Sequence, residues 1–282
     1  MSDLNNISVI ITGGSKGIGK SIATYLFGKG ANIIICSRNH DDIAATCKEI
    51  DPEERRCLGV AADVSVSSDA KKVIDCALSH FGRIDVLINN AGTIGEANLF
   101  ENSDLVKWED TIMTNVLGTV NCSHSVIEEM KKNKRGTIIN FAGAGVGGKS
   151  PLTHFASYVT SKMAVVGFTE VIASELRDYN ITVNAIAPGA INSNITEYIL
   201  REGVEKVGEA MYKKTLVQKE NGGDSLENVF SLIDFLISGE SRNVTGKLLS
   251  AKWDTLQVLK NLEDGSNLFT LRRIDNELFY GK

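Results

Sequence analysis

Short apolar runs alternate with longer amphipathic segments along most of the chain. Seven runs are rich in Val and Ile and mostly lack polar alternation, which predicts strands buried on both faces of a parallel sheet. They span residues 7–12, 32–37, 57–62, 84–89, 137–142, 181–187 and 247–251. Between them, apolar residues recur at helical spacing over 18–29, 41–50, 68–81, 109–132, 155–179 and 226–238.

Strands that alternate with helices predict βαβ units, and right-handed crossovers place the helices on both faces of the sheet. We therefore expect an α/β protein, a doubly wound Rossmann-type parallel sheet of about seven strands. The main domain would cover residues 1–252, with one or two polar helices inserted near 192–220 as a substrate lid. Residues 253–282 are too few to fold alone, so we expect an extension packed on the domain or on a subunit partner.

Composition and charge narrow the classes of function. The chain has 282 residues, of which 43% are hydrophobic, and a formal net charge of -5, which disfavours nucleic-acid binding. It has neither a secretory signal pattern nor an apolar run long enough to cross a membrane, so we expect a cytoplasmic protein without membrane contact. Its 5 cysteines form no CxxC pair or zinc-type cluster with histidine, so we expect free thiols and no metal site.

The turn after the first predicted strand is rich in glycine. It reads TGGSKGIG from Thr12, and a helical pattern follows at once. Glycines at 13, 17 and 19 permit a tight turn and close approach to a pyrophosphate, whose charge the next helix N-terminus stabilises. A glycine-rich turn without a ligand is the alternative, but the strand–turn–helix context favours dinucleotide binding.

This TGxxxGxG spacing resembles the nucleotide-binding motif of the short-chain dehydrogenases/reductases. Three further motifs resemble that family in the same order: NNAG from Asn89, YxxxK from Tyr158 to Lys162, and Pro188-Gly189 after the sixth strand. The resemblance covers about residues 5 to 250. It implies an NAD(P)(H)-dependent oxidoreductase that interconverts a carbonyl and a secondary alcohol by hydride transfer.

Two basic side chains bear on the choice of dinucleotide. NAD-binding units of this type carry a carboxylate near the end of the second strand for the ribose 2′-OH, whereas this strand ends in Ser37-Arg38-Asn39. Arg38 and Lys16 could pair with a 2′-phosphate, although solvated surface charges are the alternative. We expect NADP(H) to be preferred, with NAD(H) as the other possibility.

The resemblance also implies which residues contact the cofactor. They are Gly13, Ser15, Lys16, Gly17, Ile18, Gly19, Arg38, Asp63, Val64, Asn90, Ala91, Gly92, Tyr158, Lys162, Pro188, Gly189, Ile191 and Ser193. Without the resemblance, Asp63 could equally be a helix-capping acid.

Tyr158 and Lys162 are candidate catalytic residues. They are four positions apart in a helical segment, so their side chains share one face. An ammonium near a phenol lowers the pKa of the phenol, which would suit Tyr158 to exchange a proton with the alkoxide. By resemblance, Lys162 also holds the nicotinamide ribose, and Asn115 helps to hold a proton-relay water.

The serine that completes this group in the family has no counterpart here. The fifth strand continues as NFAGAG from Asn140, and counting from the strand end or back from Tyr158 reaches Gly143 or Gly145. Loss of one oxyanion donor typically costs about 10²–10³ in rate. A backbone N–H, Ser150 or Thr153, or a hydroxyl of a large substrate could replace it.

The sequence therefore predicts an NADP(H)-dependent enzyme acting on a polar, sugar-like small molecule, and a homodimer or homotetramer as in the family. Gly143, Gly145 and His154 are candidate substrate contacts, although a lone histidine is more often structural. The missing serine leaves an alternative, an inactive relative that binds dinucleotide as a regulatory or scaffold module.

Overall fold

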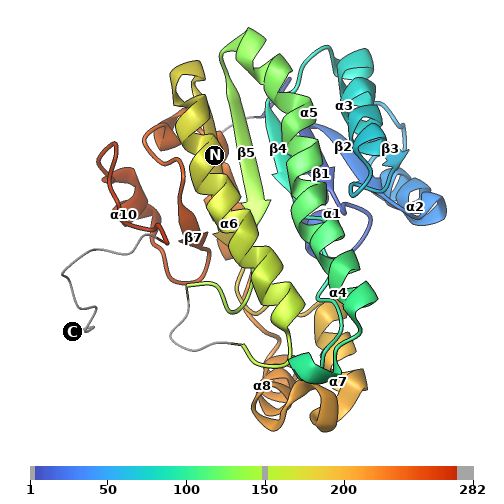
Figure 1. The fold of residues 1–282 in the computed structure, drawn as a ribbon. Coiled ribbons are helices and arrows are strands. Elements are labelled where there is room, and N and C mark those ends of the chain that lie inside the picture. Colours follow the sequence, from blue (N-terminus) through green and yellow to red (C-terminus); the bar gives the residue numbers. More distant parts are fainter. Residues whose placement is uncertain (1–3, 148–151, 272–282) are drawn as a thin grey trace.

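The computed structural model describes residues 4–147 and 152–271. Seven strands form one parallel sheet in the order β3-β2-β1-β4-β5-β6-β7 (Figure 1). The strands are β1 Ser8–Thr12, β2 Asn32–Ser37, β3 Cys57–Ala61, β4 Val86–Asn89, β5 Gly136–Phe141, β6 Ile181–Ala187 and β7 Leu248–Ser250. The predicted doubly wound sheet is confirmed. The strand order reverses between β1 and β4, where folds of this kind form a ligand crevice at the carboxyl ends of the strands.

Helices cover both faces of the sheet. They are α1 Gly17–Gly28, α2 His40–Ile50, α3 Ser67–Phe81, α4 Leu105–Ile112, α5 Gly118–Asn133, α6 Ala156–Leu176, α7 Asn194–Val207, α8 Glu209–Glu220, α9 Leu226–Ile237 and α10 Leu256–Lys260. The helices α1, α2 and α9 share one hydrophobic core with the sheet, and α3, α5 and α6 share the other. None of the helices described here is both long and apolar enough to span a membrane.

The two cores explain the unbroken apolar runs of the sequence. Val9 and Ile11 of β1 face the core under α1, while Ile10 faces the core under α3 and α5. All five residues of β1 are buried. Because helices cover the sheet on both sides, neither set of strand side chains needs to be polar.

One predicted helix is interrupted. The pattern over 109–132 predicts a single helix, whereas the structure has α4, a π-helical turn at Met113–Leu117 and then α5. Asn115 lies in this turn and is fully buried. The extra residue of a π turn can aim one side chain away from the regular helical surface, and such turns are frequent at functional sites.

Buried amides connect the elements that carry the site. The Asn89 side chain donates from Nδ2 to Asn140 Oδ1 (2.9 Å), and Asn140 Nδ2 donates to Thr169 Oγ1 (2.8 Å). These contacts join β4, β5 and α6 in the interior. A buried polar group without a partner is costly, so the network fixes these three elements relative to one another.

The segment after β7 runs along the last strand of the sheet. Leu259 and Leu262 are buried, whereas Leu268 is 62% exposed. The Leu248 N–H donates to Phe269 O (2.7 Å), so this segment covers part of the open edge of β7. Residues 272–282 of the predicted extension lie outside the described residues.

Candidate active site

The glycine-rich turn after β1 packs directly against the segment after β4. Asn90 Nδ2 donates to Thr12 O (3.0 Å) and Gly13 O (3.2 Å). A Cβ atom on Gly13 would lie 2.9 Å from Ala91 Cα, and one on Gly19 would lie 2.4 Å from Gly13 O. These two positions therefore require glycine because the backbones approach so closely.

The same turn leaves the start of α1 open. Lys16 is the N-cap, but no side chain accepts a hydrogen bond from the first backbone N–H groups, and the first turn has no acidic residue. Gly17 has φ +54°, and a Cβ atom there would meet no atom within 4 Å. Free N–H groups at the positive end of a helix dipole fit an anionic pyrophosphate, so this turn can hold a dinucleotide.

The two basic residues singled out from the sequence differ in their surroundings. Lys16 forms a 2.7 Å ion pair with Asp42 of α2. Arg38 is exposed, and within residues 4–147 and 152–271 it takes part in no ion pair. The next residue, Asn39, caps α2 by accepting from the N–H groups of Asp41 and Asp42.

Asp63 shapes the turn before α3. Its Oδ1 accepts from Ser65 N (3.0 Å) and Ser65 Oγ (2.7 Å). The carboxylate therefore closes a turn and does not cap α3, whose N-cap is Val66, so the capping alternative is wrong. Val64 beside it is buried and packs in the core with α3 and α5.

Three polar side chains predicted as catalytic converge beyond the carboxyl ends of β4 and β5. The helix α6 carries both Tyr158 and Lys162, and Lys162 Nζ donates to Phe141 O (2.8 Å). A Cβ atom on Gly92 would lie 3.1 Å from Asn115 Oδ1 and 3.3 Å from Lys162 Nζ. Asn115 and Lys162 therefore approach the same point of the backbone.

The segment after β4 and the helix α6 hold the Asn115 side chain in a fixed orientation. Its Oδ1 accepts from Thr93 N (2.8 Å), and its Nδ2 donates to Thr93 O (2.8 Å) and Ser161 Oγ (2.9 Å). No spacing pattern in the sequence marks Ser161 or Thr93, because their contacts with Asn115 arise between segments far apart in the chain.

Gly143 and Gly145, the two candidates for the serine position, have different neighbours in the structure. A Cβ atom on Gly143 would lie 2.0 Å from Tyr158 Oη, whereas one on Gly145 would meet Val159 and Leu152. Gly143 is therefore the position that faces the phenol, and the phenol fills the space a side chain would need. Of the other hydroxyls considered, Thr153 is exposed and Ser150 lies outside the described residues.

Burial dominates the electrostatics of the pair. It raises the pKa of Tyr158 to about 12 and lowers the pKa of Lys162 to about 8. The sequence predicts that Lys162 lowers the pKa of Tyr158, and this direction is wrong for the structure described here. The reason is desolvation, which penalises both the phenolate and the ammonium.

Other predicted site residues make contacts within α7, α8 and the loop after β6. The His154 ring lies against Gly208, between α7 and α8, where a Cβ atom on the glycine would be 2.9 Å from Nε2. Ser193 Oγ accepts from Ile195 N (3.3 Å) and caps α7. After Pro188-Gly189, the Ala190 N–H donates to Asp224 Oδ2 (2.7 Å), a contact that nothing in the sequence reveals.

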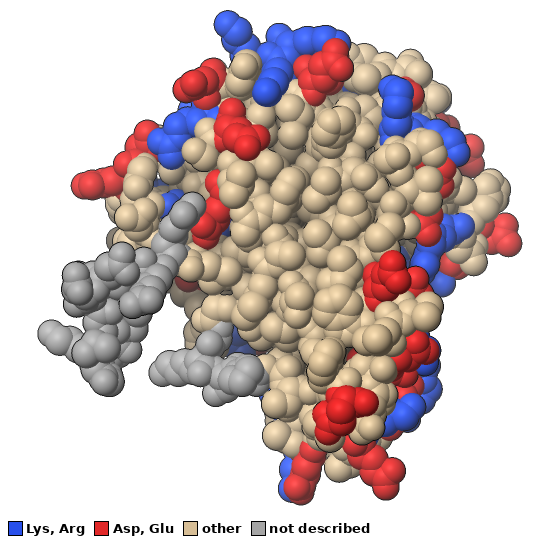
Figure 2. Space-filling model, in the orientation of Figure 1, with Lys and Arg blue, Asp and Glu red and all other residues tan. Residues whose placement is uncertain are grey.

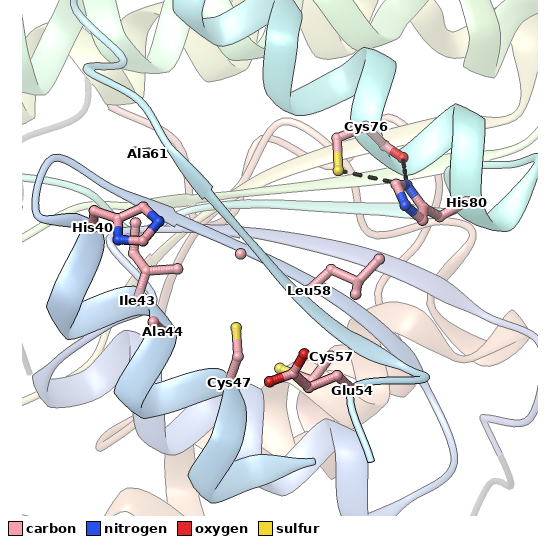
Figure 3. A pocket seen from close by; sticks show the side chains of 11 residues that line it. His40, Ile43, Ala44, Cys47, Glu54, Cys57, Leu58, Ala61, Cys76 and His80 are labelled. Atoms are coloured by element: carbon pink, nitrogen blue, oxygen red, sulfur yellow. Dashed lines mark hydrogen bonds between the residues drawn. The ribbon is translucent and has the colours of Figure 1, made fainter. Parts of the chain in front are cut away.

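A separate cavity lies at the β3 edge of the sheet (Figure 3). It has a volume of about 300 Å³, and its walls come from α2, β3 and α3. Cys47, Cys57 and Cys76 line it together with His40 and His80. Within the described part of the chain, no group of three or more His, Cys, Asp or Glu residues is arranged to hold a metal ion.

We predict that replacing Lys162 by methionine stabilises the fold. The folded-state pKa of Lys162, about 8, lies below its usual 10.5, so the unfolded chain binds more protons between these values. The stability of the natural protein should therefore rise with pH across that window, while the full cost of burying the ammonium applies below pH 8.

Denaturant titration should find K162M more stable at neutral pH, by on the order of 1–3 kcal/mol, with the difference shrinking as the pH approaches 10.5. Lys48→Met, at an exposed position of α2, is the control and should lack this pH dependence. A less stable K162M at neutral pH would contradict the prediction.

Known proteins resemble this chain over the part that carries the candidate site. The family model described as short chain dehydrogenase matches residues 8–203. A 3-oxoacyl-(acyl-carrier-protein) reductase of Staphylococcus epidermidis is 33% identical over 245 residues, which is 86% of this chain and 96% of the relative.

Two solved structures share the fold closely. NAD⁺-bound xylitol dehydrogenase has a TM-score of 0.79 at 25% identity and covers 88% of this chain and 98% of its own. A variant of actinorhodin polyketide ketoreductase with NADPH has a TM-score of 0.78 at 27% identity and covers 88% and 96%. The chain belongs to the short-chain dehydrogenase family, whose members are oxidoreductases.

Proposed function

We propose that this protein is an NADP(H)-preferring enzyme that interconverts a carbonyl compound and a secondary alcohol. The observation that carries the proposal is the convergence of Tyr158, Lys162 and Asn115 beside Gly92 and Gly143. They lie next to a glycine turn whose free N–H groups fit a pyrophosphate. A scaffold that only bound the dinucleotide would not need a buried lysine and tyrosine in this arrangement.

Each residue would have a distinct role. A bound nicotinamide dinucleotide supplies or accepts the hydride. Tyr158 keeps its proton at neutral pH, because its pKa is about 12, and so can donate to the oxygen that becomes a hydroxyl. Lys162 exchanges a proton near pH 8, so it can replenish the proton of Tyr158 through water, and Asn115 lies beside it at Gly92.

The glycine at position 143 makes Tyr158 the main donor to the reacting oxygen. The phenol lies against the Gly143 backbone, where the family has a serine side chain. A single donor implies a slower chemical step or a substrate that supplies its own hydroxyl. This is also the feature that favours the alternative function, a dinucleotide-binding module without turnover.

Arg38 supports the preference for NADP(H). It is exposed at the end of β2 and forms no ion pair with the rest of the described chain, so it is available to a 2′-phosphate. Lys16 contributes less than the sequence suggests, since Asp42 already neutralises it at 2.7 Å. NADP(H) is therefore proposed on Arg38, with NAD(H) as the second cofactor.

The substrate is proposed to be a small carbonyl compound bound under α7 and α8. The charges of these helices pair among themselves, as Glu202 with Lys206, Glu209 with Lys213 and Glu197 with Lys219. They therefore add little support for a sugar-like substrate. Ile199 and Val207 of α7 form an apolar cluster with Ile94, Phe155 and Tyr158. Both polyols and 3-oxoacyl compounds, named in the relatives, belong in an assay.

We also propose that the chain forms a homodimer or homotetramer. Figure 2 shows a broad face around α5 and α6 on which charged side chains are confined to the rim. Met163 and Val171 of α6 are exposed on their helix, at 47% and 53%. Leu105 and Val106 of α4 are also exposed, at 68% each. Exposed apolar side chains on a face with few charges are typical of contacts between subunits.

Turnover that depends on Tyr158 would establish the proposed function. We expect NADPH oxidation with at least one carbonyl compound from a panel of keto-sugars and 3-oxoacyl compounds. Tyr158→Phe should lower kcat by about 10²–10⁴ while retaining NADPH binding, because only the proton donor is removed. Tyr179→Phe, just beyond the other end of α6, is the control. NADPH binding without turnover of any compound would instead favour the binding module.

Restoring the serine should damage the enzyme. Gly143→Ser and Gly143→Ala should each lower kcat by about 10²-fold, because the new Cβ atom displaces the Tyr158 phenol. Ala144→Ser adds a hydroxyl at the neighbouring exposed position and should change little. Steady-state kinetics check this, and a higher kcat in Gly143→Ser would mean that the phenol yields and the serine completes the site.

Arg38 should decide between the cofactors. Arg38→Ala should lower kcat/KM for NADPH by about 10–100-fold, because a charged hydrogen-bonding partner of the 2′-phosphate is lost, and leave NADH nearly unchanged. Arg135→Ala, before β5 at the far end of the sheet, is the control. A wild-type protein that uses NADH more efficiently than NADPH would refute the preference.

A further inference from the structure

The loop after β6 is held from outside by a carboxylate at the start of α9. Asp224 Oδ2 accepts from Ala190 N (2.7 Å), and Asp224 N donates to Ala190 O (2.9 Å). Ile191 and Gly223 form an antiparallel bridge beside this pair. Gly223 has φ +74°, and a Cβ atom there would lie 2.6 Å from Ala190 O, so the two segments approach as closely as their backbones allow.

Lys252 completes the contact from a third segment. It follows β7, and its Nζ lies 2.8 Å from Asp224 Oδ1 and 5.0 Å from the centroid of the Trp253 ring. The Asp224 side chain is only 18% exposed. The ammonium of Lys252 holds the pKa of Asp224 below its usual value, so the carboxylate is charged at neutral pH. We call the contacts of Asp224 with Ala190 and Lys252 the clasp.

The clasp lies where the helical insert joins the domain. The helix α7 begins shortly after Ile191, and α8 ends shortly before Gly223. The clasp therefore joins the two chain segments that connect the insert to the domain. The helix α9 anchors it, since Val229, Leu232 and Ile233 are buried in the core. A loop braced in this way keeps its backbone in one position without help from a ligand.

We propose that Asp224 and Lys252 are positioning residues that hold Gly189–Ile191 in place against the nicotinamide. The inference rests on the proposed function, in which this loop meets the nicotinamide end of the dinucleotide. Preorganisation of the loop removes an ordering cost from binding. The clasp should therefore affect only ligands that reach the loop, and leave the phosphate turn and the adenosine end unaffected.

Calorimetric titration can separate these two parts of the binding site. The probes are NADPH and 2′-phospho-ADP-ribose, which is the same molecule without its nicotinamide. Asp224→Ala should weaken NADPH binding by about tenfold, because a buried charged acceptor is lost, and weaken the fragment by less than about twofold. Asp224→Asn keeps an oxygen that can accept from the Ala190 N–H, and should recover most of the affinity. Lys252→Met should resemble Asp224→Asn.

A lid ion pair outside the clasp provides the matched control. Glu197→Gln breaks the 2.9 Å pair with Lys219 and should alter neither titration. Hydrogen exchange in peptides covering residues 189–193 gives a second readout and should accelerate in Asp224→Ala alone. Unchanged NADPH binding, or equal weakening of NADPH and the fragment, would overturn the inference while leaving the proposed function intact. A wild-type protein that binds neither probe would overturn both.

Discussion

The candidate site depends on backbone segments that approach too closely for a Cβ atom. At Gly13 and Gly19 the turn after β1 lies against its own backbone and against Ala91. At Gly92 the polar ends of Asn115 and Lys162 reach the main chain, and at Gly143 the phenol of Tyr158 does. Parallel strands bring their carboxyl ends to one edge, so these contacts all fall in the same place. A side chain at Gly13, Gly19 or Gly143 would push apart groups that lie in contact, and one at Gly92 would crowd Asn115 and Lys162.

The same crowding explains the electrostatics of the site. Lys162 is buried and donates to the Phe141 carbonyl, and burial lowers its pKa to about 8. Tyr158 is buried beside it, and its pKa rises to about 12. Desolvation thus disfavours the charged form of both groups. The buried ammonium of Lys162 lowers stability at neutral pH, and proteins generally keep such groups for chemistry rather than for folding.

The insert of α7 and α8 is held differently from the core. Its inner side contributes Ile199 and Val207 to a small apolar cluster with Tyr158, while its charges pair along its outer surface. The two chain segments that connect it to the domain are joined by the hydrogen bond from Ala190 to Asp224. The insert is thus held where it joins the domain and packs against the Tyr158 side chain. A shift of the insert would therefore also move the loop after β6.

The sequence by itself determined the fold class, the number of strands and most element boundaries to within one or two residues. This was possible because a sheet covered on both faces requires apolar runs, and helices packed on it require helical periodicity. Local order also revealed the glycine turn and the spacing of Tyr158 and Lys162. Tertiary structure decided what depends on contacts between distant segments. These contacts are the π turn at Asn115, the pairing of Lys16 with Asp42, the phenol against Gly143 and the carboxylate of Asp224 on Ala190. No local pattern encodes them, because each is fixed by how separate elements pack and by the desolvation that follows.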